Sequence, residues 1–453
     1  MANVITNFLR QVRRRLTGQN IPLITETINE MRTEQALWKR IYQNKSPWLT
    51  KNVKSLNLAA TIAAEVSRLV TLDIKSSVND EEINKIYQRE IMRGLRNQVE
   101  YGLALGGFVM KPYAANGVIR VDFAQPADYQ IVSAASDGTI LEIFFKDFTQ
   151  QKNNYYIRIE YHKFDELNSR YFISNRVFRS DEKGTIGTEI TDFSNIDAWA
   201  NIEPEFELQN IKMPLFGYFK PAVSNNIDTK SSQGISVFAR AIDAIKRADI
   251  QLSGLMREFR VKEAKQYVSS TALPGGKKAA PLPYLEYDYY IKLDMADKTG
   301  SDKFFESYSP ELYSQQFLDV LDEYKRQIED CIGMSHGTIS SPDRVARTAT
   351  EIQVSKDRTA ILVSENQNNL QECFENAIYA LSVWKNWPNR PPELTVTTEW
   401  DDSTWVNWES QLTGMREDVA SGLIKGVLYV MKKYGVDEAT ALEMMPDSAE
   451  LLK

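Results

Sequence analysis

The chain has 453 residues, of which 43% are hydrophobic and 25% charged, as expected of a soluble globular protein with a large core. Its 54 Lys and Arg are outnumbered by 61 Asp and Glu, which gives a formal net charge of −7. A protein that holds nucleic acid tightly is usually basic, so an ordinary DNA-binding factor is disfavoured. A surface past which DNA slides without sticking is still compatible with this charge.

Cysteine usage and hydropathy exclude further classes. Cys331 and Cys373 are not in a CxxC pair, so the sequence shows no disulfide framework or zinc site, and intracellular assembly is the simplest inference. No run approaches the ~18 apolar residues that a membrane span requires. Residues 1–15 place arginines after an interrupted apolar set, which predicts an amphipathic helix and not a signal peptide. That helix packs on its own subunit or contacts a capsid partner or a membrane.

The first half of the chain changes its hydrophobic period once. Residues 25–110 have apolar positions at three- and four-residue steps, which predicts helices up to the break at Gly106-Gly107. From 117 to 180 the period is two, with turn residues between the apolar runs, which predicts an antiparallel meander. Its candidate strands are 118–123, 140–145, 155–161 and 170–173.

The second half is again mostly helical. A helix is predicted over 235–265, ~45 Å long at 1.5 Å per residue, followed by a small module of strands and turns over 266–309. Pro310 is expected to open a second helix that ends at Gly333. A small, polar loop follows. The last predicted elements are a long helix over 348–384, a strand over 394–398 and a helical tail from 407. The predicted fold class is therefore α+β, mostly helical.

Five stretches of sequence occur in an order that is similar to one known family. They are Ala104 to Gly107 with Lys111-Pro112-Tyr113; Tyr171 to Phe178; Phe219 to Asp228 with Gly234 to Ala239, Ala241 to Asp243 and Arg257 to Arg260; Gly337-Thr338 with Thr348 to Glu351; and Arg416 to Ile424 with Glu438-Ala439 and Met444 to Pro446. Together they resemble the portal proteins of tailed phages, of the type found in siphophages of Gram-positive hosts. One departure is that the family's loop often carries an aromatic residue between the two motifs of the fourth stretch, and here it has none.

The resemblance implies an organisation in named regions. These are a wing (1–232), two stem helices (233–265 and 310–333), a clip (266–309), a tunnel loop (334–347), a long helix and strand returning to the wing (348–406), and a helical crown (407–453). It also implies a ring of twelve subunits at one capsid vertex, which conducts double-stranded DNA during packaging and ejection. The implied partners are a terminase motor, a head–tail adaptor or connector, and the major capsid and scaffolding proteins, with no membrane. No cofactor is expected.

The tunnel loop is the candidate DNA-facing element. Small polar residues predict a flexible backbone there, and two arginines are placed to contact phosphate. The candidate residues are Ser335, His336, Thr338, Ser340, Ser341, Asp343, Arg344 and Arg347. The alternative is an ordinary solvent loop whose arginines pair with Asp343 or Glu351.

Opposite charges on the two stem helices predict a contact between neighbouring subunits. Helix 235–265 holds seven basic and four acidic residues, a net of +3, whereas helix 310–332 holds six acidic and two basic residues, a net of −4. In a ring, the first helix of one copy would lie beside the second helix of its neighbour. The candidate residues are Arg240, Arg247, Arg257, Asp319, Asp322 and Glu323. The alternative is that the two helices simply pair within one subunit.

The clip and the sparse chemical motifs complete the analysis. Lys277, Lys278, Tyr284 and Tyr287 are the candidate docking residues of the clip. The run Pro274 to Lys278 lacks the first glycine and the final Ser or Thr of a phosphate-binding loop. With only His162 and His336, no HExxH motif and no clustered ligand set, we expect no enzyme activity and no metal site. The alternative function is another virion structural protein, such as a head–tail adaptor or minor capsid protein.

Overall fold

The computed structural model describes residues 29–115, 117–182, 187–262, 265–269, 290–293, 305–308, 311–342, 349–389, 391–400, 408–434 and 436–445. Three groups of predictions therefore lie outside the described residues. They are the amphipathic helix of residues 1–15, the docking residues Lys277, Lys278, Tyr284 and Tyr287, and the loop residues Asp343, Arg344 and Arg347.

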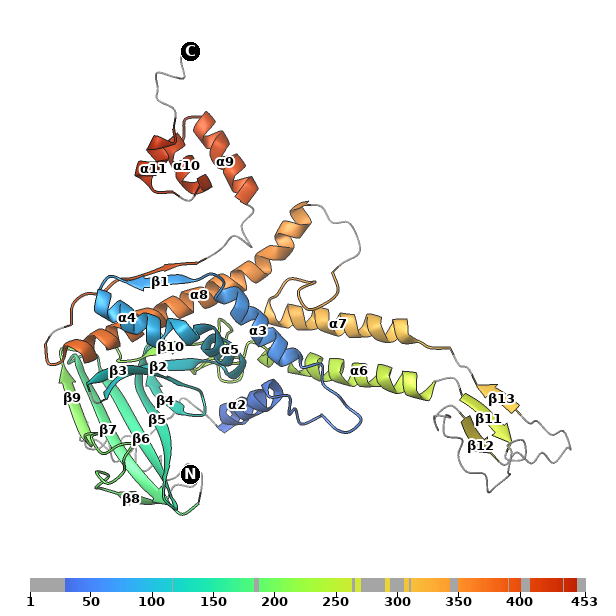
Figure 1. The fold of residues 1–453 in the computed structure, drawn as a ribbon, viewed down its shortest axis with the longest axis horizontal. Helices are drawn as coiled ribbons and strands as arrows, with labels where there is room; N and C mark the ends of the chain where they lie inside the picture. The colour runs from blue at the N-terminus through green and yellow to red at the C-terminus, as the bar shows by residue number, and fades with distance from the viewer. Residues whose placement is uncertain are drawn as a thin grey trace, which may run out of the picture.

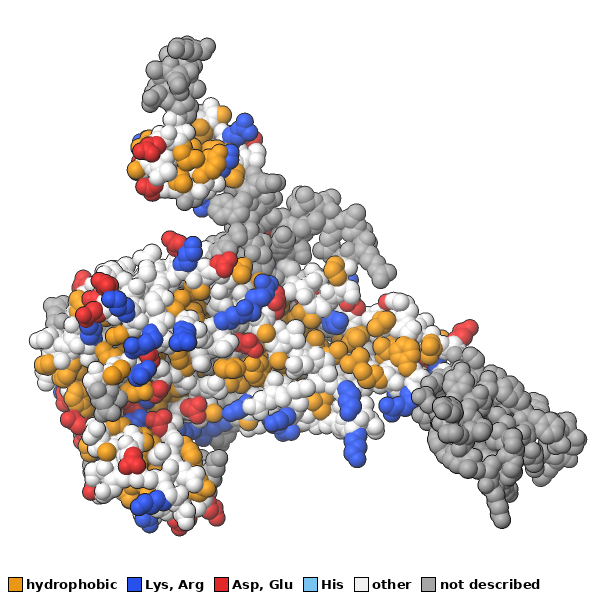
Figure 2. Space-filling model, in the orientation of Figure 1, with side chains coloured by type: hydrophobic (Ala, Val, Ile, Leu, Met, Phe, Trp, Pro, Cys, Tyr) orange, Lys and Arg blue, Asp and Glu red, His pale blue; other side chains and the backbone are white. Residues whose placement is uncertain are grey.

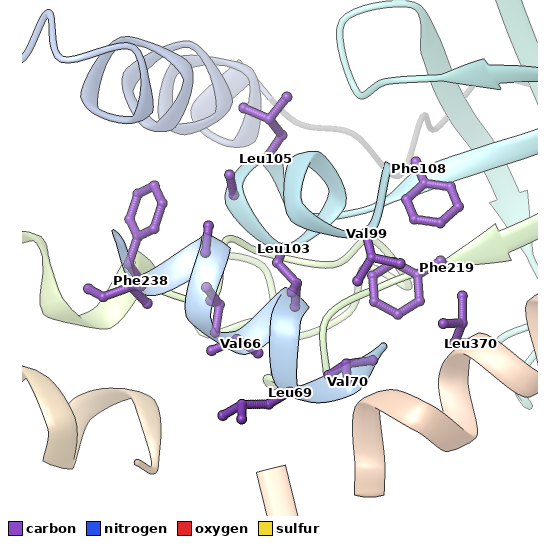
Figure 3. Packing of buried hydrophobic residues seen from close by; sticks show 14 of the residues in the cluster. Val66, Leu69, Val70, Val99, Leu103, Leu105, Phe108, Phe219, Phe238 and Leu370 are labelled. Atoms are coloured by element: carbon purple, nitrogen blue, oxygen red, sulfur yellow. The ribbon is translucent and has the colours of Figure 1, made fainter. Parts of the chain in front are cut away.

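The main core lies where the N-terminal helices meet one long helix. The elements are α2 (Asn29–Tyr42), α3 (Leu58–Val70), α4 (Glu81–Glu90), the 3-10 turn η1 (Met92–Gly94), α5 (Leu95–Leu105) and α8 (Ala349–Asn386). Figure 3 shows Leu103 of α5 and Val66 of α3 packing in this core, with Leu370 of α8 at its edge. Removing this apolar surface from water is the main stabilising term of the fold.

Local signals in the sequence set the ends of these helices. The Asp80 side chain accepts a hydrogen bond from Ile83 N at 2.8 Å and so caps α4. Gly106 ends α5 with φ 94°, and a Cβ there would lie 2.7 Å from the carbonyl oxygen of Gly234. Glycine is therefore required at 106 both by its backbone conformation and by the close approach of residues 234–235.

Two small antiparallel sheets border this core. The first has the order β10-β2-β3 and is formed by β2 (Phe108–Ala115), β3 (Val118–Ala124) and β10 (Gly217–Phe219). The second pairs β1 (Lys75–Val78) with β14 (Val396–Glu399). The prediction that residues 25–110 are helical is therefore wrong at β1 and at the start of β2. The strand predicted over 394–398 is found two residues later.

The predicted meander forms the main sheet. Its path is β4-β5-β6-β7-β8, with β9 also pairing with β7. The strands are β4 (Tyr129–Ala134), β5 (Ile140–Gln151), β6 (Asn154–Asp165), β7 (Arg170–Ser180), β8 (Thr188–Ile190) and β9 (Glu205–Gln209). One detail of the prediction is wrong, because the strand at 118–123 belongs to the three-stranded sheet. Two further strands, β8 and β9, both pair with β7.

A pair of helices projects from the helical and sheet layers (Figure 1). The 3-10 turn η2 (Ala239–Ala241) leads into α6 (Ile242–Val261), and α7 (Ser314–Ile332) runs back beside it. At the far end, β11 (Lys265–Ser269) pairs with β12 (Tyr290–Leu293) and with β13 (Phe305–Tyr308). The helix prediction for 235–265 is too long, because α6 has 20 residues, ~30 Å at 1.5 Å each. The second helix begins at Ser314 and not at Pro310.

The C-terminal helices form a separate group (Figure 1). They are α9 (Trp408–Ala420), α10 (Gly426–Tyr434) and α11 (Glu438–Glu443). Gly422, with φ 76°, lies between α9 and α10. Trp400, just before this group, packs against the main core. None of the helices within the described residues is long and apolar enough to cross a membrane.

Candidate functional site

The helix pair is held together along its length within one subunit. Gly254 of α6 faces the ring of Phe317 on α7, where an added Cβ would lie 3.0 Å from the ring. The Gln251 side chain donates to Phe317 O at 3.2 Å, and Lys262 Nζ donates to Glu311 O at 3.0 Å. The alternative considered from the sequence, that the two helices pair within one subunit, therefore holds for α6 and α7. The predicted contact between neighbouring subunits stays a prediction and must use the remaining surface.

The base of α6 is joined to the N-terminal helices through a buried carboxylate. Asp249 is 1% exposed and accepts hydrogen bonds from Trp48 Nε1 at 2.9 Å and Leu56 N at 2.7 Å. Burial raises the pKa of this carboxyl. Asp249 counts as an acid of α6 in the sequence but contributes no negative charge to its outer surface, so the outer surface is more basic than the sequence total suggests.

The outer surface of the helix pair is rich in apolar side chains. Seven large hydrophobic residues there are 42–50% exposed: Ile250, Met256, Phe259, Leu312, Tyr313, Leu318 and Val320. Figure 2 shows hydrophobic side chains gathered over the pair, with basic side chains along the α6 edge. Exposed apolar side chains gathered on one element in this way are typical of a surface that contacts a partner.

The exposed charges of the two helices differ in sign. On α6 the exposed charged residues are Asp243, Lys246, Arg247, Arg257 and Arg260. On residues 311–332 they are Glu311, Asp319, Glu323 and Asp330, with no exposed Lys or Arg in that range. Four of the six residues predicted for the subunit contact (Arg247, Arg257, Asp319 and Glu323) are therefore exposed on the pair.

The other two predicted contact residues bind within their own chain. Arg240 is exposed, but its Nη2 donates to Ser224 O at 2.8 Å. Asp322 is half-buried and accepts from Ser341 N at 2.7 Å and from Arg326 Nε at 3.4 Å. Its pKa is lowered, because these hydrogen bonds and the Arg326 charge outweigh burial, which acts the other way. Asp322 is thus an internal anchor and not a free surface charge.

The segment after α7 folds around one buried carboxylate. Gly333 ends α7 with φ 78°, which turns the chain back so that Met334 N donates to Glu329 O at 2.9 Å. The Glu329 side chain is 0% exposed and accepts four hydrogen bonds from the segment. The donors are Ile339 N at 2.6 Å, Ser340 Oγ at 2.7 Å, Ser340 N at 2.9 Å and Gly337 N at 3.3 Å.

The same segment is attached to α8. Ser335 N donates to Thr359 Oγ1 at 2.8 Å, and the two hydroxyls lie 2.9 Å apart. Asp330 accepts from Arg358 Nη1 at 2.7 Å, and its Oδ1 lies 3.0 Å from His336 Nε2. The Arg358 hydrogen bond, with a smaller contribution from His336, lowers the pKa of Asp330. Residues 334–342 are therefore held between α7 and α8.

These contacts change the prediction for the loop. Ser335 and Ser340 are 9% and 6% exposed and bind inside the subunit, so the prediction that their side chains face DNA is wrong. Thr338 and Ser341 are exposed, and His336 is half-buried. The predicted flexible backbone is also wrong for residues 335–342, since five of their donors bind carboxylates of α7. Sequence reasoning counted Glu329 only as one of the six acidic residues of the second helix, and no local pattern marks it as a buried acceptor.

A second polar cluster lies where the three-stranded β10-β2-β3 sheet meets the six-stranded sheet. Glu160 of β6 is bound by Lys111 Nζ at 2.6 Å, Arg158 Nη2 at 3.0 Å and His162 Nε2 at 2.9 Å. His162 Nδ1 lies 2.8 Å from the Tyr171 hydroxyl. Lys111, Arg158, Glu160 and His162 line a cavity of about 470 Å³, which Trp199 also lines. His162 is 3% exposed and is bonded through both ring nitrogens, which is typical of a structural histidine.

The electrostatics of this cluster are consistent with a structural role. Burial alone would raise the pKa of Glu160, but Lys111, Arg158 and the His162 hydrogen bond hold it well below its usual value. Burial lowers the pKa of His162, so the ring is neutral near pH 7. Within the described residues, no group of three His, Cys, Asp or Glu side chains is placed to hold a metal ion.

The comparisons identify the family. Residues 30–426 match the model of the family described as "Phage portal protein, SPP1 Gp6-like", so the chain belongs to this family of tailed-phage portal proteins. It is accordingly a bacteriophage virion protein with a role in genome packaging. No curated protein matches the sequence.

Proposed function

We propose that this chain is the subunit of a ring that surrounds a channel for double-stranded DNA during packaging and ejection. The observation that carries the proposal is the outer surface of the helix pair, where apolar side chains are half-exposed and the two helices expose charges of opposite sign. A surface that is basic on one side and acidic on the other matches a copy of itself in a head-to-tail arrangement, which closes into a ring.

Apolar contacts supply most of the association in this proposal. An exposed ion pair contributes only ~0.2–1 kcal/mol, so the charges set register and partner orientation. Burying a half-exposed Phe, Leu, Ile or Met side chain contributes more, at ~25 cal/mol per Å² of apolar surface. The charges lie beside the apolar residues on the same two helices, so one interface uses both.

The regions of the chain take the family's roles in this proposal. Helices α6 and α7 are the stem, and residues 266–309 at their far end are the clip, which docks the terminase motor and the head–tail connector. Residues 1–232 with α8 form the wing, α9 to α11 form the crown, and residues 334–347 form the tunnel loop. The capsid and scaffolding proteins are further partners at the capsid vertex.

The charge of the chain suits a conduit. Twelve copies at −7 give a ring of roughly −84, which repels phosphate wherever that charge faces the channel. DNA then slides with transient contacts and does not bind tightly. The exposed side chains of Thr338 and Ser341 are the described part of the loop available for such contacts.

Electron microscopy of the purified chain tests the ring directly. We expect particles with a central channel wide enough for a duplex. Charge reversal at Asp319 and Glu323, which are exposed on α7, should weaken ring assembly, and a compensating reversal at Arg247 and Arg257 should restore it. A chain that stays monomeric at high concentration, or rings that are indifferent to both sets of changes at low salt, would contradict the proposal.

A further inference from the structure

The position of Glu329 gives it a role beyond packing. It lies one turn before the end of α7, is fully buried, and has its carboxylate surrounded by donors from residues 337–340. A buried carboxylate is costly unless it is hydrogen-bonded, and here the channel segment itself provides the donors. The segment and the carboxylate therefore stabilise each other.

We propose that Glu329 is the positioning residue of the tunnel loop, fixing residues 337–340 onto the end of the second stem helix. The proposal deepens the proposed function, because it concerns how the channel-facing element is held. Two neighbouring contacts extend the unit: Ser341 N to Asp322 Oδ1 at 2.7 Å, and Ser335 N to Thr359 Oγ1 at 2.8 Å. The start of the loop therefore moves with α7 and with the adjoining part of α8.

The two carboxylate oxygens of Glu329 accept hydrogen bonds from different donors. Oε1 accepts from Ile339 N and Ser340 N, and Oε2 accepts from Gly337 N and Ser340 Oγ. A carboxylate offers acceptors on both sides, whereas an amide offers one oxygen and one NH₂ group. Glu329→Gln therefore keeps the volume but turns a donor toward one pair of donors. The Gly337 N–H, which also donates to Ser340 Oγ at 2.9 Å, cannot accept a hydrogen bond from that NH₂ group.

Amide hydrogen exchange on the full chain tests the inference without reference to DNA. We expect exchange of the amides in 337–340 to rise roughly 10-fold or more in Glu329→Gln, and further in Glu329→Ala. Ser340→Ala removes a hydroxyl that donates to Glu329 Oε2 and accepts from Gly337 N, so it should raise exchange mainly at Gly337 and less at 339–340. Glu365→Gln is the matched control, because Glu365 is an exposed carboxylate of α8. Unchanged exchange in both Glu329 variants would overturn the proposal.

A packaging assay then asks whether this positioning matters for the channel. Phage particles complemented with Glu329→Gln should form rings but package or retain several-fold less DNA than particles with Glu365→Gln. Normal DNA content despite rapid exchange at 337–340 would overturn the positioning role. Rings that never form, in the wild-type chain as well, would instead contradict the proposed function and leave the exchange result standing. If Glu329→Ala does not fold, the volume-conserving Glu329→Gln decides.

Discussion

Lys111 Nζ lies 2.6 Å from Glu160 Oε2, and both side chains are buried where the three-stranded sheet meets the six-stranded sheet. Lys111 pairs in register with Asp122 across β2 and β3, and Glu160 pairs with Phe145 and Asn175 in the larger sheet. The ion pair therefore joins two sheets that share no backbone ladder. This joint holds the two sheets together, at a point distant in sequence from α6 and α7.

Removing one partner of this pair should destabilise the fold strongly. Lys111→Met leaves Glu160 buried with a smaller set of donors, and breaking a buried pair typically costs about 3–5 kcal/mol. Because Arg158 and His162 still bind Glu160, the expected value is at the lower end. Thermal unfolding measures the effect. Lys85→Met, which breaks an exposed pair with Glu81 at 2.7 Å, is the control and should change stability by less than about 0.5 kcal/mol. Equal shifts for the two variants would show that the joint is not stabilising.

The same cluster predicts a pH dependence. The pKa of His162 is lowered in the folded chain by burial, so the unfolded chain binds more protons once the pH falls below about 6.5. Stability is therefore full above that pH and declines as the pH falls toward the lowered folded value. Glu160, whose folded pKa is also lowered, adds a second decline that begins only below about 4.5. We expect the melting temperature to fall between pH 7 and pH 5.

A variant that lacks His162 separates this effect from other titrations. His162→Gln removes the ring that titrates in this window but retains a side chain able to donate to Glu160. Its melting temperature should be lower at pH 7 but should change less between pH 7 and pH 5. A slope identical to that of the wild-type chain would assign the pH dependence to other groups.

The sequence analysis was most accurate for elements whose apolar residues keep one regular spacing over a long run. The predicted helix 348–384 matches α8, which spans Ala349–Asn386, because its core positions continue over many turns. β2 was missed because it contains Pro112 and follows two glycines. Proline is tolerated there because β10 pairs only with Phe108 to Met110. On that side of β2, Pro112 has no neighbouring strand to which a backbone N–H would have to donate. Such compatibility depends on the partner strand and is not visible in a local pattern.

The candidate site was predictable in position but not in its contacts. The Gly333 break and the small polar residues after it placed the loop correctly. What they could not show is that Glu329 receives donors from residues 8–11 positions further on, since that depends on how the chain turns after Gly333. The same limit applies to Asp322 and Asp249, which read as surface charges of amphipathic helices and are internal acceptors in the fold.

The apolar surface of the helix pair predicts the effect of an added charge. Leu318 is 46% exposed on α7, within the proposed subunit contact, and Leu318→Glu would bury a carboxylate among apolar side chains when the ring forms. We expect the ring to be lost or to require a much higher protein concentration, with the subunit fold unchanged. Leu167→Glu is a matched control, because Leu167 is 97% exposed between β6 and β7. Sedimentation measures both, and ring loss in the control alone would contradict the proposed interface.

The exposed part of the loop predicts a charge effect on DNA passage. Thr338 is exposed, and Thr338→Glu would add one negative charge per subunit facing the proposed channel. Packaging should be slower, whereas Thr338→Gln, of the same size and uncharged, should be close to the wild type. Both changes remove the bond from Thr338 Oγ1 to Ser335 O, so the difference between them reports charge alone. The measurement is the DNA content of complemented particles, and equal content in both variants would place Thr338 away from the duplex.

Two glycines predict opposite effects of the same substitution. A Cβ on Gly217 would lie 2.2 Å from the carbonyl oxygen of Cys373, so Gly217→Ala must push β10 away from α8. That shift disturbs the contact between the sheet layer and the long helix, and overpacking of this kind costs about 1–3 kcal/mol. Gly414 lies inside α9 with nothing within 4 Å of an added Cβ, so Gly414→Ala should stabilise that helix by about 0.5–1 kcal/mol. The melting temperature should therefore fall for Gly217→Ala and should stay the same or rise for Gly414→Ala. A Gly217→Ala protein as stable as the wild type would show that α8 and β10 are not in close backbone contact.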